Sequence, residues 1–266
     1  MSRAAQGPGA PASTGRAILL PHLVLPGAEQ MALDAALLRW ASAAPGRFVA
    51  RTYDWARPTL SLGRAEPFPE GWDEGALAAA GVDVVRRPTG GDAVLHDEEV
   101  TFAVAASVPG PWAARPRAFS LLVAESLAEA LRALGLLAGV VAPGEEGLPP
   151  AAPGARPCFA RAAAGEVRVA GLKAAGIASR FTRGAALSHA SLPLTARHRD
   201  VARFRRDAAP ALAGIAAHAR SIGETLGSPP SPEAVRATLL GALVRRFGVA
   251  AVPGVLEEIA GGTPSR

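Results

Sequence analysis

The stretch Arg86–Phe102, RRPTGGDAVLHDEEVTF, decides much of what the sequence says about the fold. The residues before it, VDVV, favour a β-strand that ends at the two arginines, and Gly90 and Gly91 allow the backbone to turn. A short strand or loop then leads to His96, and the apolar run that starts at Glu99 favours a long strand. The stretch therefore predicts neighbouring strands joined by a glycine turn.

The same stretch has the composition of a binding site. Arg86 and Arg87 lie beside a turn whose backbone N–H groups can face a ligand, and such groups bind an anion or a carboxyl group. The alternative is a hairpin that needs glycines for its turn and carries arginines on its surface. The residue pattern alone leaves both interpretations open.

The second informative stretch is GLKAAGIASR, Gly171–Arg180. It contains Lys173, the only lysine among the 28 lysine and arginine residues of the chain. An ammonium group is a more compact charge than a guanidinium group, and on a short strand between Gly171 and Gly176 it could meet a carbonyl, a carboxylate or a phosphate. An exposed lysine on a β-hairpin is the alternative.

Cys158 is the only cysteine of the chain, and it follows a stretch rich in proline and glycine. It cannot form a disulfide within the chain, and a zinc site built on several cysteines is excluded. A thiol after such a loop is expected to be accessible, and a nearby ammonium group would lower its pKa and increase the thiolate fraction. A buried cysteine that packs as a small apolar residue is the alternative.

The composition is that of a globular chain. Its 266 residues suit one large domain or one domain with a small addition, and 49% of them are hydrophobic, which is enough for a core. No run of about 18 apolar residues predicts a membrane span. The net charge of +5 would fit nucleic acid, an acidic protein partner or a phosphate-bearing ligand, although much of the arginine reflects a general bias towards Ala, Gly, Pro and Arg. The single cysteine suits a cytoplasmic protein.

The remaining pattern alternates between helices and strands, with no internal repeat. Helices are expected near residues 27–43, 69–81, 120–136 and 231–248, the last one capped by Ser231 and started by Pro232, within a segment that is helical from Thr195 onward. Strands are expected near 47–55 and 59–64 and, as a set of three, within 166–194. These elements predict an α+β fold in which a mixed or largely antiparallel sheet is flanked by helices.

His189 and Ser191 follow one of the expected strands, in the stretch LSHASLPL. A histidine in such a place is more often a structural hydrogen-bonding group than a base. The chain has no G-x-S-x-G elbow, no Walker loop and no H-E-x-x-H pair, so the common hydrolase, P-loop and zincin sites are excluded.

Taken together, these stretches resemble the biotin/lipoate A/B protein ligase family, which includes the lipoate–protein ligases and the octanoyltransferases. RRPTGGDAVLHDEEVTF is similar to the family's R-R-x-[ST]-G-G-x-A-V-x-H-[DE] segment, and GLKAAGIASR to its G-x-K-x-x-G-x-A-x-R segment. MALDAALL, RTYDWARPTLSLGR, RPCF, LSHASLPL and SPEAVRATLLGALVRRFG extend the resemblance over roughly Leu19 to Glu258. It implies a class II aminoacyl-tRNA synthetase/biotin synthetase-like catalytic domain over residues 18–195, with a helical segment at 196–266 packed on the same domain. Residues 1–17 are rich in Gly, Pro, Ser and Ala, and this composition predicts a disordered leader.

Within the family, GGDAVLHDEEVTFAV and the Cys-Phe pair are most similar to the cysteine-dependent octanoyl-[acyl-carrier-protein]:protein N-octanoyltransferases. This likeness implies that Cys158 accepts the octanoyl group as a thioester and that Lys173 lowers the pKa of its thiol. The octanoyl group would pass from octanoyl-acyl carrier protein to a lipoyl domain of a 2-oxoacid dehydrogenase or to the glycine cleavage H protein, with no cofactor, metal, nucleic acid or membrane. The substrate-binding residues that the matching motifs imply are Arg86, Arg87, Thr89, Gly90, Gly91, Ala93, His96, Gly176, Ala178, His189 and Ser191.

Three positions depart from the family pattern. Asp92 stands where a third glycine is usual, Ile177 stands where serine is frequent, and Ala190 stands between His189 and Ser191 where glycine is common. The Asp92 carboxylate would lie near the phosphate of an acyl-adenylate, which argues against ATP-dependent ligation. Ile177 would reshape the pocket for the acyl chain.

Two other functions remain open from the sequence. A lipoate–protein ligase would use ATP and Mg²⁺ to activate lipoate as lipoyl-AMP, with Lys173 binding the adenylate and Cys158 incidental. A non-catalytic basic module that binds acidic acyl carrier protein or nucleic acid would leave both of these residues without a chemical role.

Overall fold

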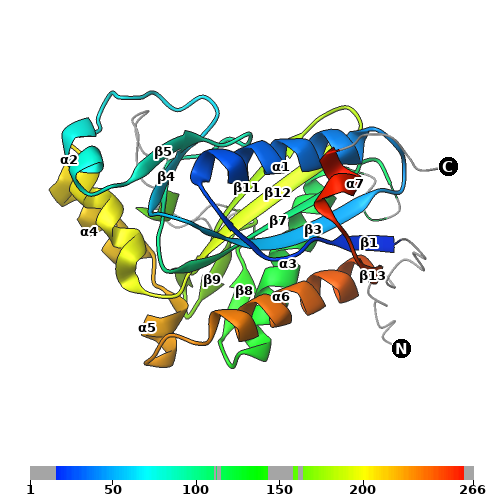
Figure 1. The fold of residues 1–266 in the computed structure, drawn as a ribbon. Coiled ribbons are helices and arrows are strands. Elements are labelled where there is room, and N and C mark those ends of the chain that lie inside the picture. The colour runs from blue at the N-terminus through cyan, green and yellow to red at the C-terminus, as the bar shows by residue number, and fades with distance from the viewer. Residues whose placement is uncertain (1–15, 111, 113–114, 143–157, 161–163, 261–266) are drawn as a thin grey trace, which may run out of the picture.

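A seven-stranded mixed sheet forms the centre of the molecule (Figure 1). The computed structural model describes residues 16–110, 112, 115–142, 158–160 and 164–260. Strands follow the order β11-β12-β7-β3-β1-β13, and β2 pairs with β3 beside this path. Their bounds are β1 Arg16–Leu19, β2 Leu23–Leu25, β3 Phe48–Trp55, β7 Glu99–Ser107, β11 Gly176–Phe181, β12 Ala185–Pro193 and β13 Ala250–Pro253.

Helices cover both faces of this sheet (Figure 1). Helix α1 (Gly27–Ser42) lies on one face with the short α7 (Leu256–Ala260), and α3 (Pro116–Ala133) and α6 (Pro232–Phe247) pack together on the other. Because both faces are covered, every residue of β7 and of β12 is buried. The polar residues of these strands must therefore find partners inside the protein.

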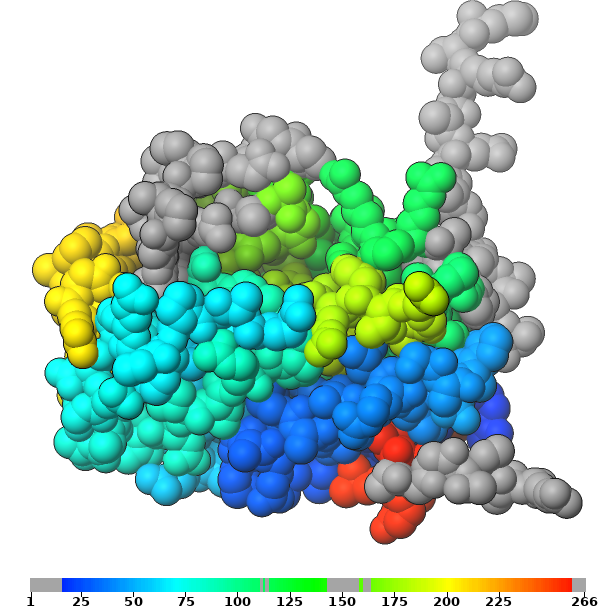
Figure 2. Space-filling model, turned by 90° about the horizontal axis from the view of Figure 1, so that it is seen from above, coloured from blue at the N-terminus to red at the C-terminus, as the bar shows by residue number. Residues whose placement is uncertain are grey.

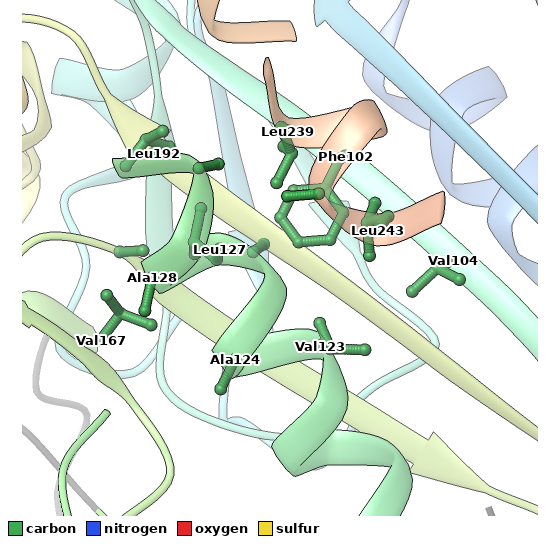
Figure 3. Close-up of a cluster of buried hydrophobic side chains, with 14 of the residues drawn as sticks. Phe102, Val104, Val123, Ala124, Leu127, Ala128, Val167, Leu192, Leu239 and Leu243 are labelled. Atoms are coloured by element: carbon green, nitrogen blue, oxygen red, sulfur yellow. The ribbon is translucent and has the colours of Figure 1, made fainter. Parts of the chain in front are cut away.

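The larger apolar core lies between the sheet and the pair α3 and α6 (Figure 3). Phe102 of β7 lies between the two helices, close to Leu127 of α3 and Leu239 of α6 in the close-up, and all three are fully buried. Each buried side chain of this size contributes about 1.5–3 kcal/mol through removal from water. This core fixes β7 and β12, and these strands carry several of the site residues.

Two small sheets flank the central one. Strands β5 (Asp83–Arg86), β4 (Thr59–Leu62) and β6 (Val94–His96) form one of them, and β10 (Leu172–Lys173), β9 (Val167–Val169) and β8 (Ala138–Val140) form the other. The 3₁₀ turn η1 (Cys158–Ala160) packs beside α4 (Ala208–His218). The remaining elements are α2 (Glu74–Ala79), the 3₁₀ segment η2 (Ala196–Phe204) and α5 (Ile222–Leu226).

The predicted α+β class with mixed sheets flanked by helices is confirmed. The stretch 166–194 differs in detail, because it forms four strands rather than three and divides them between two sheets. The division occurs at Ala174 and Ala175, which follow the two-residue β10 and are themselves almost fully buried. Gly176 then begins β11, which pairs with β12 in the central sheet.

The C-terminal segment was predicted to be helical, and α6 has the predicted start. The Ser231 hydroxyl accepts from Ala234 N at 3.5 Å, Pro232 occupies the first turn, and Gly248 ends the helix with φ 60°. The segment also supplies β13, which the sequence did not reveal, and β13 pairs in parallel with β1. Its four residues have no clear alternation, so only the pairing with β1 makes them a strand.

The leader predicted at 1–17 falls mostly on residues outside the described part. Its last two residues, Arg16 and Ala17, begin β1, and Ala17 is fully buried. Of the helices in the described part of the chain, none combines the length and the apolar character that crossing a bilayer requires.

Candidate active site

A cavity of about 100 Å³ lies where the central sheet meets both small sheets, and it collects most of the residues that the motifs singled out. Apolar and aromatic side chains form one part of its lining, and charged or hydrogen-bonding side chains form the rest. Helix α1 and the segment after β4 form much of the surface of the face that Figure 2 shows. The lining residues are Met31, Tyr53, Trp55, Ser61, Arg87, Gly91, Asp92, Val94, His96, Thr101, Cys158, Glu166, Lys173, Gly176, Ile177, Ala178, His189, Ala190 and Ser191.

Cys158 begins the turn η1, and its backbone is held by residues 88–93, the glycine loop, which contains Gly90 and Gly91. Its backbone N–H donates to the carbonyl oxygen of Ala93 at 3.0 Å, and its side chain is half-buried. A side chain at Gly176 would bring its Cβ to 3.3 Å from Cys158 Sγ. Glycine at this position therefore leaves room for the thiol.

Lys173 lies against Cys158 and is 1% exposed. Its ammonium Nζ donates to the carbonyl oxygen of Cys158 at 2.7 Å, to Cys158 Sγ at 3.3 Å and to Glu166 Oε1 at 2.6 Å. A two-residue turn at Ala170 and Gly171, with φ 49° and 81°, joins β9 to β10 and turns the chain back so that Lys173 faces inward. These three contacts use all the N–H groups of the ammonium.

Burial raises the pKa of the Cys158 thiol, and Lys173 acts against this while Glu166 adds to it. The lowering effect predicted for Lys173 is present, although burial outweighs it and the thiol pKa is raised overall. Burial also acts to lower the pKa of Lys173, yet the sulfur of Cys158 and the Glu166 carboxylate outweigh it and raise that pKa. Lys173 therefore stays an ammonium group beside the thiol.

Arg87 shapes the glycine loop from inside. It is 4% exposed and donates to three carbonyl oxygens, those of Ser61, Gly90 and Asp92, each at 2.8 Å. Arg86 is exposed and donates to the carbonyl oxygen of Gly63 at 2.7 Å. The sequence suggested these arginines for an anion site, whereas the structure uses both of them to hold main-chain carbonyls.

His189 connects the glycine loop to helix α1. Its Nε2 lies 2.6 Å from Thr89 Oγ1, and its Nδ1 lies 3.0 Å from Asp34 Oδ2. Burial lowers the pKa of His189, although Asp34 acts against the shift. Asp34 also accepts from Arg51 Nη2 at 2.6 Å and from the Tyr53 hydroxyl at 3.1 Å. His189 is thus a structural hydrogen-bonding group in the cavity wall, as its sequence context favoured.

His96 belongs to a second buried network. Its Nδ1 lies 2.7 Å from Glu99 Oε1 and its Nε2 lies 2.7 Å from Ser61 Oγ, while its ring stacks on Trp55 with centroids 4.1 Å apart. Glu99 also accepts from Ser191. Burial raises the pKa of Glu99, but His96 and the hydroxyl donors outweigh it and lower that pKa. The network holds an ionised carboxylate behind the cavity wall.

The structure brings together most, not all, of the residues predicted for the site. Those that line the cavity are Cys158, Lys173, Arg87, Gly91, His96, Gly176, Ala178, His189 and Ser191, and the three departures Asp92, Ile177 and Ala190 line it too. The other four, Arg86, Thr89, Gly90 and Ala93, stand behind the lining and hold the loop or the Cys158 backbone.

Three contributing residues, Glu166, Asp34 and Glu99, were missed by the sequence reasoning. Glu166 could have been found from the expected hairpin around Gly171, because it lies two residues before Arg168, the residue that pairs with Lys173, and residues two apart in an extended chain point to the same side. Asp34 could have been found as the lone carboxylate inside the apolar run MALDAALL, where a charged side chain needs a buried partner. No such signal pointed to Glu99, since a carboxylate at the start of a strand is ordinarily exposed.

The arrangement suits acyl chemistry on a sulfur atom. An ammonium group in contact with a cysteine sulfur can stabilise its thiolate and a developing oxyanion, and the apolar part of the lining can take an alkyl chain. Within the described ranges, no group of three or more His, Cys, Asp or Glu side chains is placed to hold a metal ion.

Known proteins share both sequence and fold with this chain. A family model for the lipoyl protein ligase A/B catalytic domain matches residues 26–244. Octanoyltransferase LipM of Kyrpidia tusciae is 35% identical over 246 residues, which cover 86% of each chain. Octanoyltransferase LipM of Moorella thermoacetica is 32% identical over 234 residues, covering 86% of this chain and 85% of that one.

Solved structures of lipoate ligases have the same fold. A bi-partite lipoate protein ligase from Thermoplasma acidophilum superposes with a TM-score of 0.70 at 20% identity, covering 94% of this chain and 90% of that one. Lipoate-protein ligase A bound with ATP gives a TM-score of 0.69 at 19% identity, covering 94% and 92%. The resemblance inferred from the motifs is confirmed, and the chain belongs to the family of the lipoyl protein ligase A/B catalytic domain.

Proposed function

We propose that this chain moves an octanoyl group from acyl carrier protein to a lysine of a lipoyl domain, through a thioester on Cys158. The observation that carries the proposal is the contact between Lys173 Nζ and Cys158 Sγ at 3.3 Å in the wall of the cavity. The relatives named octanoyltransferase LipM support the choice of acyl group, because they align with this chain over most of both lengths.

In the first step the Cys158 sulfur attacks the thioester carbon of the octanoyl carrier. The bond from that carbon to the carrier's sulfur breaks, and the proton of Cys158 ends on the carrier's thiol. The Lys173 ammonium group stabilises the attacking thiolate, and its charge also stabilises the oxyanion. One thioester replaces another, so the step needs no outside source of energy.

In the second step the amine of the acceptor lysine attacks the Cys158 thioester. An amide forms, the bond from the carbonyl carbon to Sγ breaks, and Cys158 is restored as a thiol. This step is downhill because an amide is more stable than a thioester. The complete reaction therefore needs neither ATP nor a metal ion.

The partners follow from this chemistry. Octanoyl-acyl carrier protein is the donor, and lipoyl domains of 2-oxoacid dehydrogenases or the glycine cleavage H protein are the acceptors. The bi-partite ligase of Thermoplasma acidophilum was studied together with its E2 lipoyl domain, which supports an acceptor of that kind. We place the reaction in the cytoplasm, where a single free thiol stays reduced.

The deciding experiment is the intact mass of the protein after mixing with octanoyl-acyl carrier protein in the absence of ATP. We expect the mass to rise by one octanoyl group, and the increment must lie on Cys158 if hydroxylamine removes it, because the chain has no other thiol. Cys158→Ala should prevent the increase and abolish transfer to a lipoyl domain.

Two results would argue against the proposal. Full transfer by a folded Cys158→Ala protein would exclude the covalent route. Turnover only with ATP and free lipoate would assign the chain to the ligases that share its fold. Circular dichroism of the variant establishes that it is folded in either case.

A further inference from the structure

Glu166 is an acidic partner of Lys173 for which the two steps above provide no role. Its carboxylate lines the cavity, is 13% exposed and accepts from Lys173 Nζ at 2.6 Å, the shortest of the three contacts of the ammonium group. Its carbonyl oxygen accepts from the backbone of Val141 at 2.8 Å, which ties the residue to β8. The position of Glu166 is therefore built into the small sheet that carries Lys173.

Four charged groups face the Cys158 thiol from the elements around it. Lys173 comes from β10, Glu166 precedes β9, Arg87 follows β5 and Asp92 belongs to the glycine loop. Arg87 donates to main-chain carbonyls, including the carbonyl of Asp92. Of these groups, Glu166 is the one whose carboxylate is in contact with the ammonium group of Lys173.

The charge beside Lys173 changes during acyl transfer. While the Cys158 sulfur attacks as a thiolate, the buried cation has two anionic neighbours, this sulfur and the Glu166 carboxylate. Once the sulfur carries the acyl group it is neutral, and its negative charge is gone. A buried ammonium group without an anionic partner loses its proton readily, because desolvation disfavours the charged form.

We propose that Glu166 is a positioning residue that keeps Lys173 protonated while Cys158 carries the acyl group. The inference rests on the Cys158 acyl-enzyme proposed above. As the acceptor amine attacks and the bond from the acyl carbon to Sγ breaks, Lys173 gives its proton to the leaving sulfur. The surplus proton of the attacking nitrogen then passes to Lys173, so that the amide, the thiol and the ammonium group are all accounted for.

The test separates the two half-reactions. Protein loaded from octanoyl-acyl carrier protein is mixed with a lipoyl domain, and intact mass follows the acyl-enzyme through a single turnover. In Glu166→Gln we expect the acylation rate to stay within about threefold of the wild-type rate. The deacylation rate should fall by about tenfold or more, because general acid catalysis raises a reaction rate by about 10²–10⁴-fold. Acyl-enzyme then accumulates. Glu70→Gln, a change at an exposed loop carboxylate, is the matched control and should behave as wild type.

Two further measurements distinguish this role from a structural one. The ratio of the wild-type deacylation rate to that of Glu166→Gln should fall towards one as the pH falls, because at lower pH Lys173 is protonated without the help of a carboxylate. Glu166→Asp keeps the carboxylate and should recover part of the deacylation rate. Equal slowing of both half-reactions, or a ratio that does not change with pH, would overturn the proposal.

The outcome also separates this inference from the function it rests on. If the wild type forms no acyl-enzyme, the Cys158 route is wrong and the role of Glu166 falls with it. If both proteins form the acyl-enzyme and deacylate at the same rate, the function stands and only the role of Glu166 is wrong.

Discussion

Replacing Asp34 by alanine should destabilise the protein by about 3 kcal/mol, because it leaves a buried guanidinium group without its anion. Asp34 is fully buried and Arg51 is 1% exposed, so water cannot take the place of the missing carboxylate. The carboxylate accepts from Arg51 Nε at 3.1 Å and Nη2 at 2.6 Å, and from Tyr53 and His189. Loss of one partner of a buried pair costs about 3–5 kcal/mol.

We expect the lower end of that range because Arg51 keeps other acceptors. The side-chain oxygen of Gln30 lies 2.6 Å from Nη1, and the Gln30 carbonyl oxygen lies 2.9 Å from Nη2. These two bonds retain part of the solvation of the guanidinium group when Asp34 is removed. The Tyr53 hydroxyl loses its charge-assisted hydrogen bond to the carboxylate at the same time, which adds to the cost of the uncompensated charge.

Urea denaturation at pH 7, followed by circular dichroism, measures the free energy of unfolding of each variant. Asp34→Asn should lose less than Asp34→Ala, because the amide keeps an acceptor. The double variant Asp34→Ala with Arg51→Met should be more stable than Asp34→Ala alone, since it removes the stranded charge. A loss below about 1 kcal/mol for Asp34→Ala, or no recovery in the double variant, would refute the reasoning.

The same carboxylate predicts a pH dependence. Burial acts to raise the pKa of Asp34, but Arg51 and His189 outweigh it and lower that pKa below its usual value. A group whose pKa falls on folding contributes stability above its unfolded pKa, here about 3.9, and loses it as the pH falls through the folded value. The advantage of the wild type over Asp34→Asn should therefore shrink below about pH 4.

Two further predictions concern the cavity. A Cβ at position 63 would lie 1.9 Å from the carbonyl oxygen of Gly91. Gly63→Ala should therefore lower the free energy of unfolding, measured by urea denaturation, by about 1–3 kcal/mol and reduce octanoyl transfer. Unchanged stability and activity would contradict this close approach of the two backbone segments. Ile177→Ala shortens a side chain of the cavity wall and so enlarges the cavity. The ratio of kcat/KM for a dodecanoyl donor to kcat/KM for an octanoyl donor should therefore rise. A constant ratio would show that Ile177 does not contact the acyl chain.

The sequence predicted the elements that a periodic pattern defines. The amphipathic pattern of α1, the cap of α6 and the apolar run of β7 each reflect local physics that adjacent residues reveal. Strand β13 was missed because its residues become a strand only through pairing with β1. The four strands within 166–194 were counted as three because the break at Ala174 depends on which sheet each half joins.

The site was predicted through residues that are rare or clustered. Cys158 and Lys173 stood out because the chain has one of each, and the structure places them in contact. Lys173 lowers the thiol pKa as predicted, but the larger and opposite effect of burial was not foreseen, because the burial of Cys158 depends on packing that a sequence does not display. The residue pattern left both an anion site and a surface position open for the arginines, whereas in the structure the carbonyls of the loop take hydrogen bonds of the buried Arg87.

The pairing of β1 with β13 has a consequence for synthesis of the chain. The two strands are more than two hundred residues apart, so one edge of β1 stays unpaired until β13 has been made. At about 5–20 residues per second this interval is roughly 10–50 s, during which an unpaired strand edge can join another nascent chain. β1 is four residues long, which limits the edge offered in that time, and the arrival of β13 then closes it.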